Sequence, residues 1–420
     1  MPIPYKNNSK KHPDAQLKKI AKSLAKFGWR QPIVVDKDDV IIVGHGRWEA
    51  YKKYPAGIKE PRIEIADDLT PEEVSAYRIA DNKLNESEWD MGLVIEELKG
   101  LSEEMFDLTG FDKDLLIEPD EADDIIPENV PLRSKLGDLY ELGGHRVLCG
   151  DSTQSEAVLR LMDGKKAELL FTSPPYSDMR EYGGGKDLSV CNLVNFINVF
   201  SDYVKYQVIN LGIKRDNYEI VSYWDEYIAK ARECGYRFLA WNVWAKQNAG
   251  SVGNQSSFIP ISHEWIFVFG KDFKDINRIE KRKTAIKKGK QGRTVRQPDG
   301  SMSWSTFGTQ KELKEMESVY YQVAEMGSIR KLHPATFPVD LAGKYIRSIT
   351  NQDDIVVDAF LGSGSTLIAS EKTGRICYGM ELDPKYIDVI VQRYVDYIGN
   401  ENIKLNGVDI IWKKSKIPTK

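Results

Sequence analysis

At residues 169–176 the sequence reads Leu169-Leu170-Phe171-Thr172-Ser173-Pro174-Pro175-Tyr176. It starts as an apolar run typical of a buried strand, and two prolines followed by an aromatic residue end that run. The pattern predicts a strand that delivers a stiff, polar-tipped loop to the edge of a sheet. Such a loop suits a catalytic site, but a plain Pro-Pro turn with a core tyrosine explains this stretch equally well when it is taken alone.

The chemistry that this loop suits is methylation of an amino group conjugated to a ring. The lone pair of such a nitrogen is delocalised, so a site must hold its hydrogens and direct the lone pair at a methyl donor. Ser173 and the backbone carbonyl of Pro174 can accept those hydrogens, and the Tyr176 ring can stack on a planar base. The two prolines, Pro174 and Pro175, fix the backbone and leave no competing N–H. These four residues are therefore the candidate catalytic residues.

A second motif decides between the two interpretations. It reads Ile355-Val356-Val357-Asp358-Ala359-Phe360-Leu361-Gly362-Ser363-Gly364-Ser365-Thr366, a β-branched strand that enters a glycine loop and then a helix. Backbone in such a loop can approach a nucleotide-like ligand closely. The next strand, residues 375–381, ends on Glu381, where a carboxylate can bind ribose hydroxyls. Because the P-loop lysine and the full dinucleotide fingerprint are missing, we expect a ligand that carries ribose and adenine without phosphates.

Residues 172–176 and 358–366 together resemble the S-adenosylmethionine-dependent DNA amino-methyltransferases, and their order is that of the beta class of that family. His333-Pro334-Ala335-Thr336-Phe337-Pro338 resembles the family's motif for the methionine end of the cofactor, and Asp151 resembles the carboxylate that holds the adenine amino group. The resemblance covers about residues 135–395 and implies a Rossmann-like methyltransferase with S-adenosylmethionine as cofactor. The cofactor-binding residues that it implies are Asp151, Thr172, His333, Phe337, Asp358, Phe360, Gly362, Gly364, Thr366 and Glu381.

The resemblance also implies that a base is flipped out of double-stranded DNA and methylated on its exocyclic amino group. Serine before the prolines and Phe337-Pro338 after the histidine both resemble enzymes that make 4-methylcytosine, whereas aspartate is commoner before the prolines in adenine methylators of this class. We therefore expect 4-methylcytosine, with 6-methyladenine as the alternative. Ala359 departs from the family's usual Asp-Pro-Phe, but alanine should keep the turn.

Composition is that of an ordinary soluble protein. The chain has 420 residues, of which 41% are hydrophobic and 29% charged. No apolar run approaches membrane-spanning length and no N-terminal segment resembles a signal peptide, so we expect a cytoplasmic protein that does not bind membranes. The cysteines have neither zinc-site nor disulfide spacing, so no metal is expected, and none follows a proline as the nucleophile of cytosine ring-carbon methyltransferases does. They are Cys149, Cys191, Cys234 and Cys377.

Charge is unevenly placed along the chain. The net charge is −4 and the pI about 5.9, yet residues 271–296 form a strongly basic segment. In the beta class, the region before the histidine motif is the target-recognition domain, which here corresponds to about residues 271–330. This position favours DNA contact over the alternative of a solvated charged face. The candidate DNA-binding residues are Lys281, Arg282, Lys283, Lys287, Lys288, Lys290, Arg293 and Arg296.

Residues 1–118 predict a smaller α/β domain. A helix over 16–27 ends at Gly28, strands over 32–36 and 40–43 form a hairpin, and Gly44-His45-Gly46-Arg47 opens a second helix. Thr70 and Glu73 form a capping box that begins a further helix. These residues resemble the ParB/sulfiredoxin-like domain, whose box at this junction can bind a nucleotide, so Gly44, Gly46 and Arg47 are a candidate nucleotide or phosphate site. The second ParB arginine and the sulfiredoxin cysteine are absent, which favours a domain that only assists DNA or partner binding.

Residues 119–134 begin with an acidic, proline-bearing stretch and predict a solvated linker. From residue 135 to 420, apolar runs alternate with helical stretches, the pattern of an α/β fold with a doubly wound, mostly parallel sheet. Both motifs then fall at the carboxyl ends of strands, where such sheets bind ligands. His263-Glu264 precedes a strand and is interpreted as structural rather than catalytic.

Two other function classes stay open. The Pro-Pro-Tyr signature also serves methyltransferases that act on RNA or protein, and a ParB-like DNA-binding protein could carry an inactive methyltransferase half. The basic segment argues against the first class, and the intact Ser173, Asp358 and Glu381 argue against the second. The sequence leaves open whether the protein is a monomer or a homodimer and whether a cognate restriction enzyme accompanies it.

Overall fold

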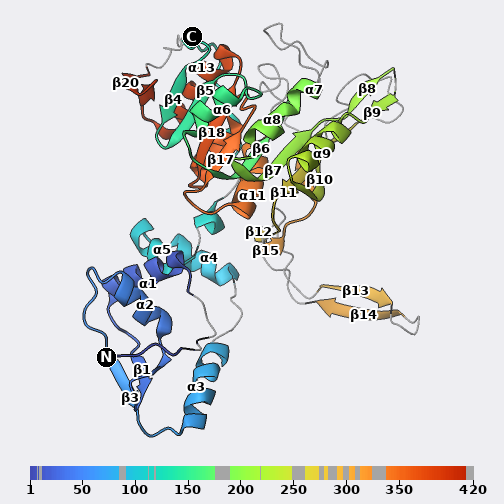
Figure 1. Cartoon of the computed structure of the whole chain (residues 1–420). Helices are drawn as coiled ribbons and strands as arrows, with labels where there is room; N and C mark the ends of the chain where they lie inside the picture. The colour runs from blue at the N-terminus through green and yellow to red at the C-terminus, as the bar shows by residue number, and fades with distance from the viewer. Residues whose placement is uncertain are drawn as a thin grey trace. The chain divides into compact units, whose positions relative to one another are not determined.

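The computed structural model describes residues 1–6, 8, 12–84, 91–111, 113–117, 120–175, 190–217, 219–247, 261–273, 279–281, 291–296, 302–307, 313–323 and 337–412. Internal contacts divide the chain into two compact units, one of residues 1–116 and 281–313 and one of residues 117–280 and 314–420 (Figure 1). None of the helices in the described ranges has both the length and the apolar character that crossing a membrane requires.

The first unit contains a three-stranded sheet in the order β2–β1–β3, with β1 (Ile33–Asp36), β2 (Ile41–Val43) and β3 (Ile63–Ala66). β1 and β2 pair antiparallel as the predicted hairpin, and β3 lies parallel to β1. Apolar side chains of β1 and β2 pack with Trp48 to form its core. The helices of this unit are α1 (Asp14–Phe27), α2 (His45–Lys53), α3 (Pro71–Leu84), α4 (Met91–Lys99) and α5 (Glu103–Thr109), followed by the 3-10 helix η1 (Lys113–Leu116).

Two local signals in this unit act as the sequence predicts. α1 ends before Gly28, which adopts a positive φ of 71° and donates its N–H to the Leu24 carbonyl. Thr70 and Glu73 form a capping box at the start of α3: the Thr70 N–H donates to Glu73 Oε2 at 2.8 Å, and the Glu73 N–H donates to Thr70 Oγ1 at 3.3 Å. Local hydrogen bonds therefore set the beginning and end of these helices.

Short strands occupy the predicted recognition region. β13 (Gln291–Arg296) pairs antiparallel with β14 (Met302–Phe307), in a register that joins Gln291 to Phe307. β12 (Ile279–Lys281) and β15 (Leu313–Glu315) form a separate two-stranded sheet. These strands lie between the strands of the large sheet in the chain order, as an inserted segment does.

The second unit is built on a sheet in the order β16–β10–β11–β7–β6–β17–β18–β5–β4–β19–β20 (Figure 1). β7, β6, β17, β18 and β5 pair in parallel at its centre. The strands are β4 (Leu139–Leu142), β5 (His145–Cys149), β6 (Ala167–Thr172), β7 (Val204–Leu211), β10 (Arg237–Gln247), β11 (His263–Gly270), β16 (Val319–Val323), β17 (Ile355–Asp358), β18 (Ile376–Glu381), β19 (Asn402–Leu405) and β20 (Val408–Ile411), and β8 (Lys214–Asp216) pairs with β9 (Glu219–Val221) in a separate hairpin.

The sheet is mixed, so the prediction of a mostly parallel sheet is correct only for its centre and for the β10–β16 pair at one edge. β4 pairs antiparallel with β5 and with β19, and β11 pairs antiparallel with both β7 and β10. The physical reason is visible in the connections. Asn406 and Gly407 join β19 to β20 as a two-residue turn with positive φ angles of 51° and 81°, and so short a turn can only join antiparallel strands.

Helices cover both faces of this sheet because strand residues alternate between two cores. Leu169 and Phe171 of β6 face a core shared with α11, α12 and α13, whereas Leu170 faces a core shared with α6, α8 and α9. The helices are α6 (Ser155–Met162), α7 (Val190–Leu193), α8 (Asn195–Phe200), α9 (Trp224–Glu233), α11 (Val339–Ile349), α12 (Ser365–Lys372) and α13 (Pro384–Ile398).

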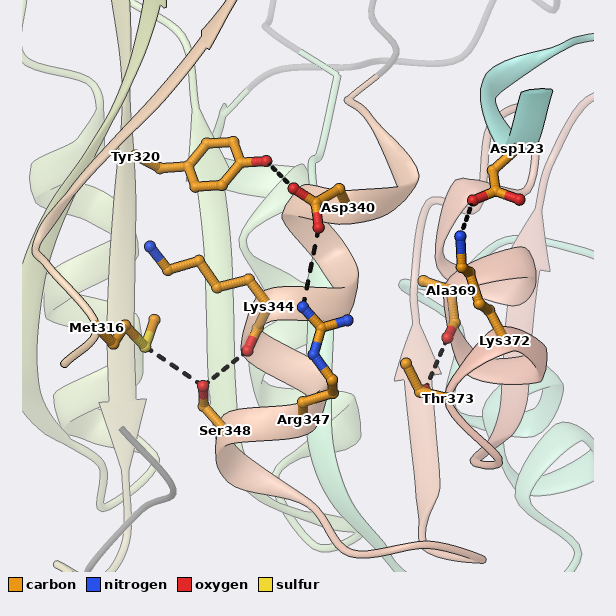
Figure 2. A network of polar contacts seen from close by, with 10 residues as sticks. All are labelled: Asp123, Met316, Tyr320, Asp340, Lys344, Arg347, Ser348, Ala369, Lys372 and Thr373. Carbon is orange, nitrogen blue, oxygen red and sulfur yellow. Dashed lines mark hydrogen bonds and ion pairs between the residues drawn. The ribbon is translucent and has the colours of Figure 1, made fainter. Parts of the chain in front are cut away.

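Two residues of the acidic stretch at the start of this unit, Asp123 and Asp124, are packed against the unit instead of being solvated. Residues Glu121–Asp124 form the 3-10 helix η2, and Asp123 is only 9% exposed and makes an ion pair with Lys372 of α12 (Figure 2). Asp124 Oδ1 accepts the Val339 N–H at the start of α11 at 2.8 Å. A carboxylate at a helix N-terminus is favourable because it meets unpaired N–H groups and the positive end of the helix dipole. The expectation of a solvated linker was wrong for Asp123 and Asp124, because the half-buried Lys372 and the start of α11, which its N-cap residue Pro338 does not cap, attract these acids.

Polar contacts also join α11 to β16 and stabilise the helix itself. Figure 2 shows the Tyr320 hydroxyl donating to Asp340, whose carboxylate lies 3.8 Å from an Arg347 nitrogen. One turn further, Ser348 Oγ donates to the Lys344 carbonyl at 2.7 Å. The contact with Tyr320 therefore helps to hold α11 on the sheet face that Leu169 and Phe171 of β6 also line.

Candidate functional site

The predicted motifs meet at one edge of the sheet. β5, β6, β17 and β18 are parallel, so their carboxyl ends lie along the same edge. The structure thereby brings together Asp151 after β5, Ser173 after β6, the glycine loop after β17 and Glu381 at the end of β18. The Gly150 N–H donates to the Glu381 carbonyl at 2.9 Å, which joins the first of these loops to the last.

The centre of this edge is a topological switch point. The chain leaves β6 through helices packed on one face of the sheet, including α8, and leaves β17 through α12 on the opposite face. β6 and β17 are neighbours and their two connections diverge, which is the point at which doubly wound sheets form a crevice outside the carboxyl ends of the strands. Doubly wound sheets bind ligands at this kind of crevice.

A buried carboxylate joins the two motifs at this crevice. Asp358 Oδ1 accepts the Thr172 hydroxyl at 2.6 Å and the Phe360 N–H at 3.0 Å, and Oδ2 accepts the Thr366 hydroxyl at 2.5 Å. Asp358 is 0% exposed, and this burial raises its pKa to about 6, although the three hydrogen bonds favour the charged form. Thr172 and Thr366 are equally buried. These hydrogen bonds therefore form a tie between the end of β6, the glycine loop and α12. Direct contact of Asp358, Thr172 and Thr366 with the cofactor stays a prediction.

The glycine loop is preformed by backbone contacts. The Gly362 N–H donates to Glu381 Oε2 at 2.9 Å, and the Asp383 N–H donates to Oε1 of the same carboxylate at 2.9 Å. Gly364 is the N-cap residue of α12 and has a φ of 90°, a conformation that side-chain-bearing residues rarely adopt. Glu381 is half-buried, and burial raises its pKa to about 7. The backbone N–H donors lower this pKa, whereas the charge of the nearby Asp383 raises it.

A buried arginine supports the glycine loop from behind, and sequence reasoning missed it. Arg393 of α13 is 4% exposed; its Nη1 donates to the Ser363 carbonyl at 2.9 Å and its Nη2 donates to the Asp123 carbonyl at 2.7 Å. Burial lowers its pKa to about 10, so it remains charged at neutral pH. The sequence did contain a sign of this role: Arg393 stands inside an apolar helical run, and an arginine is rarely buried unless it is paired.

The catalytic motif lies beside this tie. Ser173 is half-buried and Pro174 is buried. Ser173 Oγ accepts a hydrogen bond from Asn210 Nδ2 at 3.3 Å. Phe337 packs edge-on against Phe171 of β6 with ring centroids 5.1 Å apart, so it contacts the strand beneath the motif. Phe360 of the glycine loop packs in the same way on the Phe196 ring, at 5.2 Å.

Several predicted site residues lie outside the described residues. These are the catalytic candidate Tyr176, the cofactor candidate His333, and the DNA-binding candidates Arg282, Lys283, Lys287, Lys288 and Lys290. Of the remaining DNA-binding candidates, Lys281 ends β12, and Arg293 and Arg296 lie on β13. Their contact with DNA stays a prediction.

The candidate nucleotide site of the first unit has a defined local geometry. Gly44 precedes α2 with a φ of 99°, as the predicted strand-to-helix junction requires. Arg47 donates from Nη1 to Gln31 Oε1 at 2.9 Å and from Nη2 to the Pro32 carbonyl at 3.0 Å, so its guanidinium is engaged within the unit. The neighbouring His45 accepts the Tyr5 N–H, and burial lowers the pKa of His45 to about 4. An imidazole that stays neutral adds no charge for a phosphate.

With this geometry established, the family can be assigned. A family model described as DNA methylase (N6_N4_Mtase) matches residues 167–392. The chain belongs to this family of DNA methylases. The match begins at the first residue of β6 and ends within α13, so it contains Ser173, the glycine loop and Glu381. The protein is therefore a DNA amino-methyltransferase, and S-adenosylmethionine is its methyl donor.

Individual proteins show the same likeness. The orphan methyltransferase M.BamHII of Bacillus amyloliquefaciens is 27% identical over 250 residues, which cover 55% of this chain and 89% of that protein. The structure of PvuII DNA methyltransferase, described as cytosine-N4-specific, aligns over 62% of this chain and 90% of its own with 18% identity and a TM-score of 0.43. A ParB structure from Caulobacter crescentus, complexed with CTP-gamma-S, aligns over 27% of this chain and 69% of its own, with 20% identity and a TM-score of 0.24. The last likeness does not confirm the ParB-like domain.

We predict that Arg393→Met weakens cofactor binding without abolishing the fold. The substitution leaves the Ser363 and Asp123 carbonyls without their charged donor, so the glycine loop loses its support. We expect the Kd for S-adenosylmethionine to rise about tenfold, or ~1.4 kcal/mol, measured by calorimetry.

Arg375→Met is the matched control. Arg375 is also buried and donates to the Thr350 and Thr373 carbonyls, but it precedes β18 at the opposite edge of the sheet from the glycine loop. Melting curves of both variants separate loss of stability from loss of binding. Equal cofactor affinity in the two variants would show that Arg393 does not support the site.

Proposed function

We propose that the protein methylates the exocyclic amino group of cytosine in double-stranded DNA and so makes 4-methylcytosine. The observation that carries this proposal is the position of Ser173-Pro174, at the end of β6 and directly beside the Thr172–Asp358 hydrogen bond that marks the ligand crevice. The choice of cytosine depends on serine as the residue before the prolines. Adenine methylation to 6-methyladenine is the second candidate, because aspartate at this position is only commoner, not universal, among adenine methylators.

The residues at the crevice fit S-adenosylmethionine. Glu381 presents a half-buried carboxylate at the end of β18, where it can accept hydrogen bonds from ribose hydroxyls. Asp151 follows β5 on the same edge and can accept hydrogen bonds from the adenine amino group. Gly362 and Gly364 provide backbone without side chains for close approach, and Phe360 offers a half-buried ring. When bound, the cofactor supplies an electrophilic methyl group carried on a sulfonium sulfur.

The chain's own contribution is to hold the amino group. Ser173 Oγ and the Pro174 carbonyl accept its two hydrogens, which directs the nitrogen lone pair away from them. The nitrogen gains the methyl group and releases one proton to water. Flipping the base costs a few kcal/mol, and stacking on Tyr176 returns about 1–3 kcal/mol. Positioning of the reacting atoms, rather than proton transfer by the protein, then provides most of the acceleration.

DNA binding is proposed for the basic segment within residues 271–330, and an assisting role in DNA or partner binding for the first unit. The support for the segment is its charge and its place between the strands of the methyltransferase sheet. The support for the assisting role is that Arg47, the cation of the candidate nucleotide site, already donates to Gln31 and Pro32.

The proposal predicts 4-methylcytosine in duplex DNA incubated with the protein and S-adenosylmethionine, measured by nucleoside mass spectrometry. Ser173→Ala should lower the rate of methylation about 100-fold, because one acceptor for the amino group is lost at the reacting centre. Ser222→Ala, at an exposed serine before α9, should have no effect. A 6-methyladenine product would overturn the choice of base, and full activity in Ser173→Ala would overturn the role of the serine.

A second prediction concerns pH. Below pH 7 the Glu381 carboxyl of the free protein is mostly protonated, because its pKa is raised to about 7. Ribose hydroxyls bind the ionised form better, so binding must first remove that proton. We expect the affinity for S-adenosylmethionine to increase about tenfold between pH 6 and pH 8, and Glu381→Gln to bind more weakly and with no such dependence. An unchanged pH profile in Glu381→Gln would show that this carboxyl does not bind the cofactor.

A further inference from the structure

A polar chain crosses the sheet beside the catalytic motif and is not part of the mechanism described so far. It links Ser173 after β6, Asn210 of β7, Glu264 of β11 and Lys246 of β10. Asn210 Nδ2 donates to Ser173 Oγ at 3.3 Å and to Glu264 Oε2 at 2.7 Å, and Lys246 makes an ion pair with Glu264 Oε1. Sequence analysis interpreted Glu264 as structural, and the spacing of these residues in the sequence gives no sign of the chain.

Strand pairing explains why the four residues meet. β11 is antiparallel to β7 and to β10, so the start of β11 lies beside the ends of both neighbours. Asn210 pairs with Ile266, and Trp244 pairs with Glu264. The carboxyl ends of β6, β7 and β10 and the amino end of β11 therefore share the edge that carries the ligand crevice.

The chain is mostly removed from solvent. Asn210 is 1% exposed, and the side chains of Lys246 and Glu264 are 16% and 13% exposed. A charge-assisted hydrogen bond from an amide to a carboxylate is stronger than a neutral one, and low exposure strengthens it further. The hydrogen bond between Asn210 and Glu264 should therefore be the stronger of the two, and the longer hydrogen bond between Asn210 and Ser173 the weaker.

The orientation of the Asn210 amide follows from its neighbours. A flipped amide would place Oδ1 against the Glu264 carboxylate, where two acceptors repel each other, so the amide must turn its NH2 group toward Glu264. Its second N–H then faces Ser173 Oγ. Asn210 Oδ1 is buried and has no hydrogen-bond partner within the described part of the chain, and leaving a buried acceptor unpaired costs free energy. The carboxylate thus imposes an orientation that the amide alone would not favour.

Fixing the serine hydroxyl has a chemical consequence. Ser173 Oγ has two lone pairs and one hydrogen, and the hydroxyl rotates freely in the absence of a partner. A donor on one lone pair leaves the second lone pair and the hydrogen in defined directions. The same donor reduces the basicity of the oxygen, so Ser173 acts as a hydrogen-bond acceptor for the amino group and not as its base.

We propose that Asn210 is a positioning residue that aims the Ser173 lone pair at the target amino group, and that the Lys246–Glu264 ion pair sets the orientation of Asn210. This inference depends on the proposed role of Ser173 in holding the amino group. None of the three residues contacts the reacting atoms in this scheme; each acts through the next one.

The test is a double-mutant cycle between Asn210 and Ser173. Methyl transfer to duplex DNA is measured as total methyl incorporation under single turnover, so that the result does not depend on which base is methylated. Asn210→Ala should lower the rate roughly 10- to 100-fold in the wild-type background, with the cofactor Kd and the DNA KM within about twofold. In the Ser173→Ala background the same substitution should have no further effect, because the group that it positions is gone.

Further variants address the rest of the chain and the fold. Glu264→Ala should mimic Asn210→Ala. Glu264→Gln keeps an acceptor for the amide but loses the charge that pairs with Lys246 and repels a flipped amide, so it should recover only part of the rate. Full recovery in Glu264→Gln would show that the ion pair does not set the orientation of Asn210. Asn210→Asp keeps the shape of the side chain but cannot donate to Ser173, so it should be as slow as Asn210→Ala even if the smaller variant folds poorly. Asn242→Ala is the control: Asn242 lies on β10 of the same sheet, and its Nδ2 makes a buried hydrogen bond to the hydroxyl of Tyr345 on α11 instead of to Ser173.

The outcomes separate the two claims. Equal rate losses from Asn210→Ala with and without Ser173 would overturn the positioning role and leave a structural one, as would equal losses in Asn242→Ala and Asn210→Ala. Full activity of Ser173→Ala would instead overturn the role of the serine in the proposed function, and with it this inference. A 6-methyladenine product in a cycle that still shows coupling would change the base and support the positioning role.

Discussion

The structure of the site depends on the hydrogen bonds of one buried carboxylate. Asp358 accepts the Thr172 hydroxyl from the catalytic strand, the Thr366 hydroxyl from the helix after the glycine loop, and the Phe360 N–H from the loop itself. β6 and β17 lie side by side through their own strand pairing, and the hydrogen bonds of Asp358 join the catalytic motif to the cofactor loop at the ends of these strands. Burial raises the pKa of Asp358 to about 6, so ionising this carboxyl costs more free energy in the folded protein than in water.

From this tie the site is supported on two sides. Behind the glycine loop, Arg393 joins the Ser363 carbonyl to the segment that contains Asp123. On the catalytic side, the Lys246–Glu264 ion pair and Asn210 reach Ser173. In both supports a charged group acts through a neutral group: Arg393 contacts the Ser363 carbonyl, and the Lys246–Glu264 ion pair acts through Asn210. Charge then orients the site without competing for the ligand.

The sequence predicts the parts of this fold that depend on local patterns. The central strands, the end of α1 at Gly28, and the capping box of Thr70 and Glu73 all follow from spacing and turn chemistry, and the structure confirms them. The motifs fall at strand ends because the strands themselves were recognisable. The role of Asp358 was less predictable: a carboxylate in a ligand motif suggests a ligand contact, and only the three-dimensional arrangement shows that its oxygens are engaged by the chain.

The features that the sequence did not predict depend on pairing between distant residues. Nothing near Asp123 in the sequence indicates that Lys372 and the start of α11 lie beside it, so composition alone predicted a solvated linker. Glu264 gains its place through antiparallel pairing of β11, which no periodicity encodes.

The central claim is that Asp358 couples the catalytic strand to the cofactor loop, and a double-mutant cycle of Thr172→Val and Thr366→Val with S-adenosylmethionine affinity as readout tests it most directly. Valine removes each hydroxyl and keeps its volume. If both hydroxyls act through one carboxylate, the two losses should differ from additivity by about 0.5 kcal/mol or more. Losses that add to within about 0.3 kcal/mol would show that the two threonines act independently and would contradict the account.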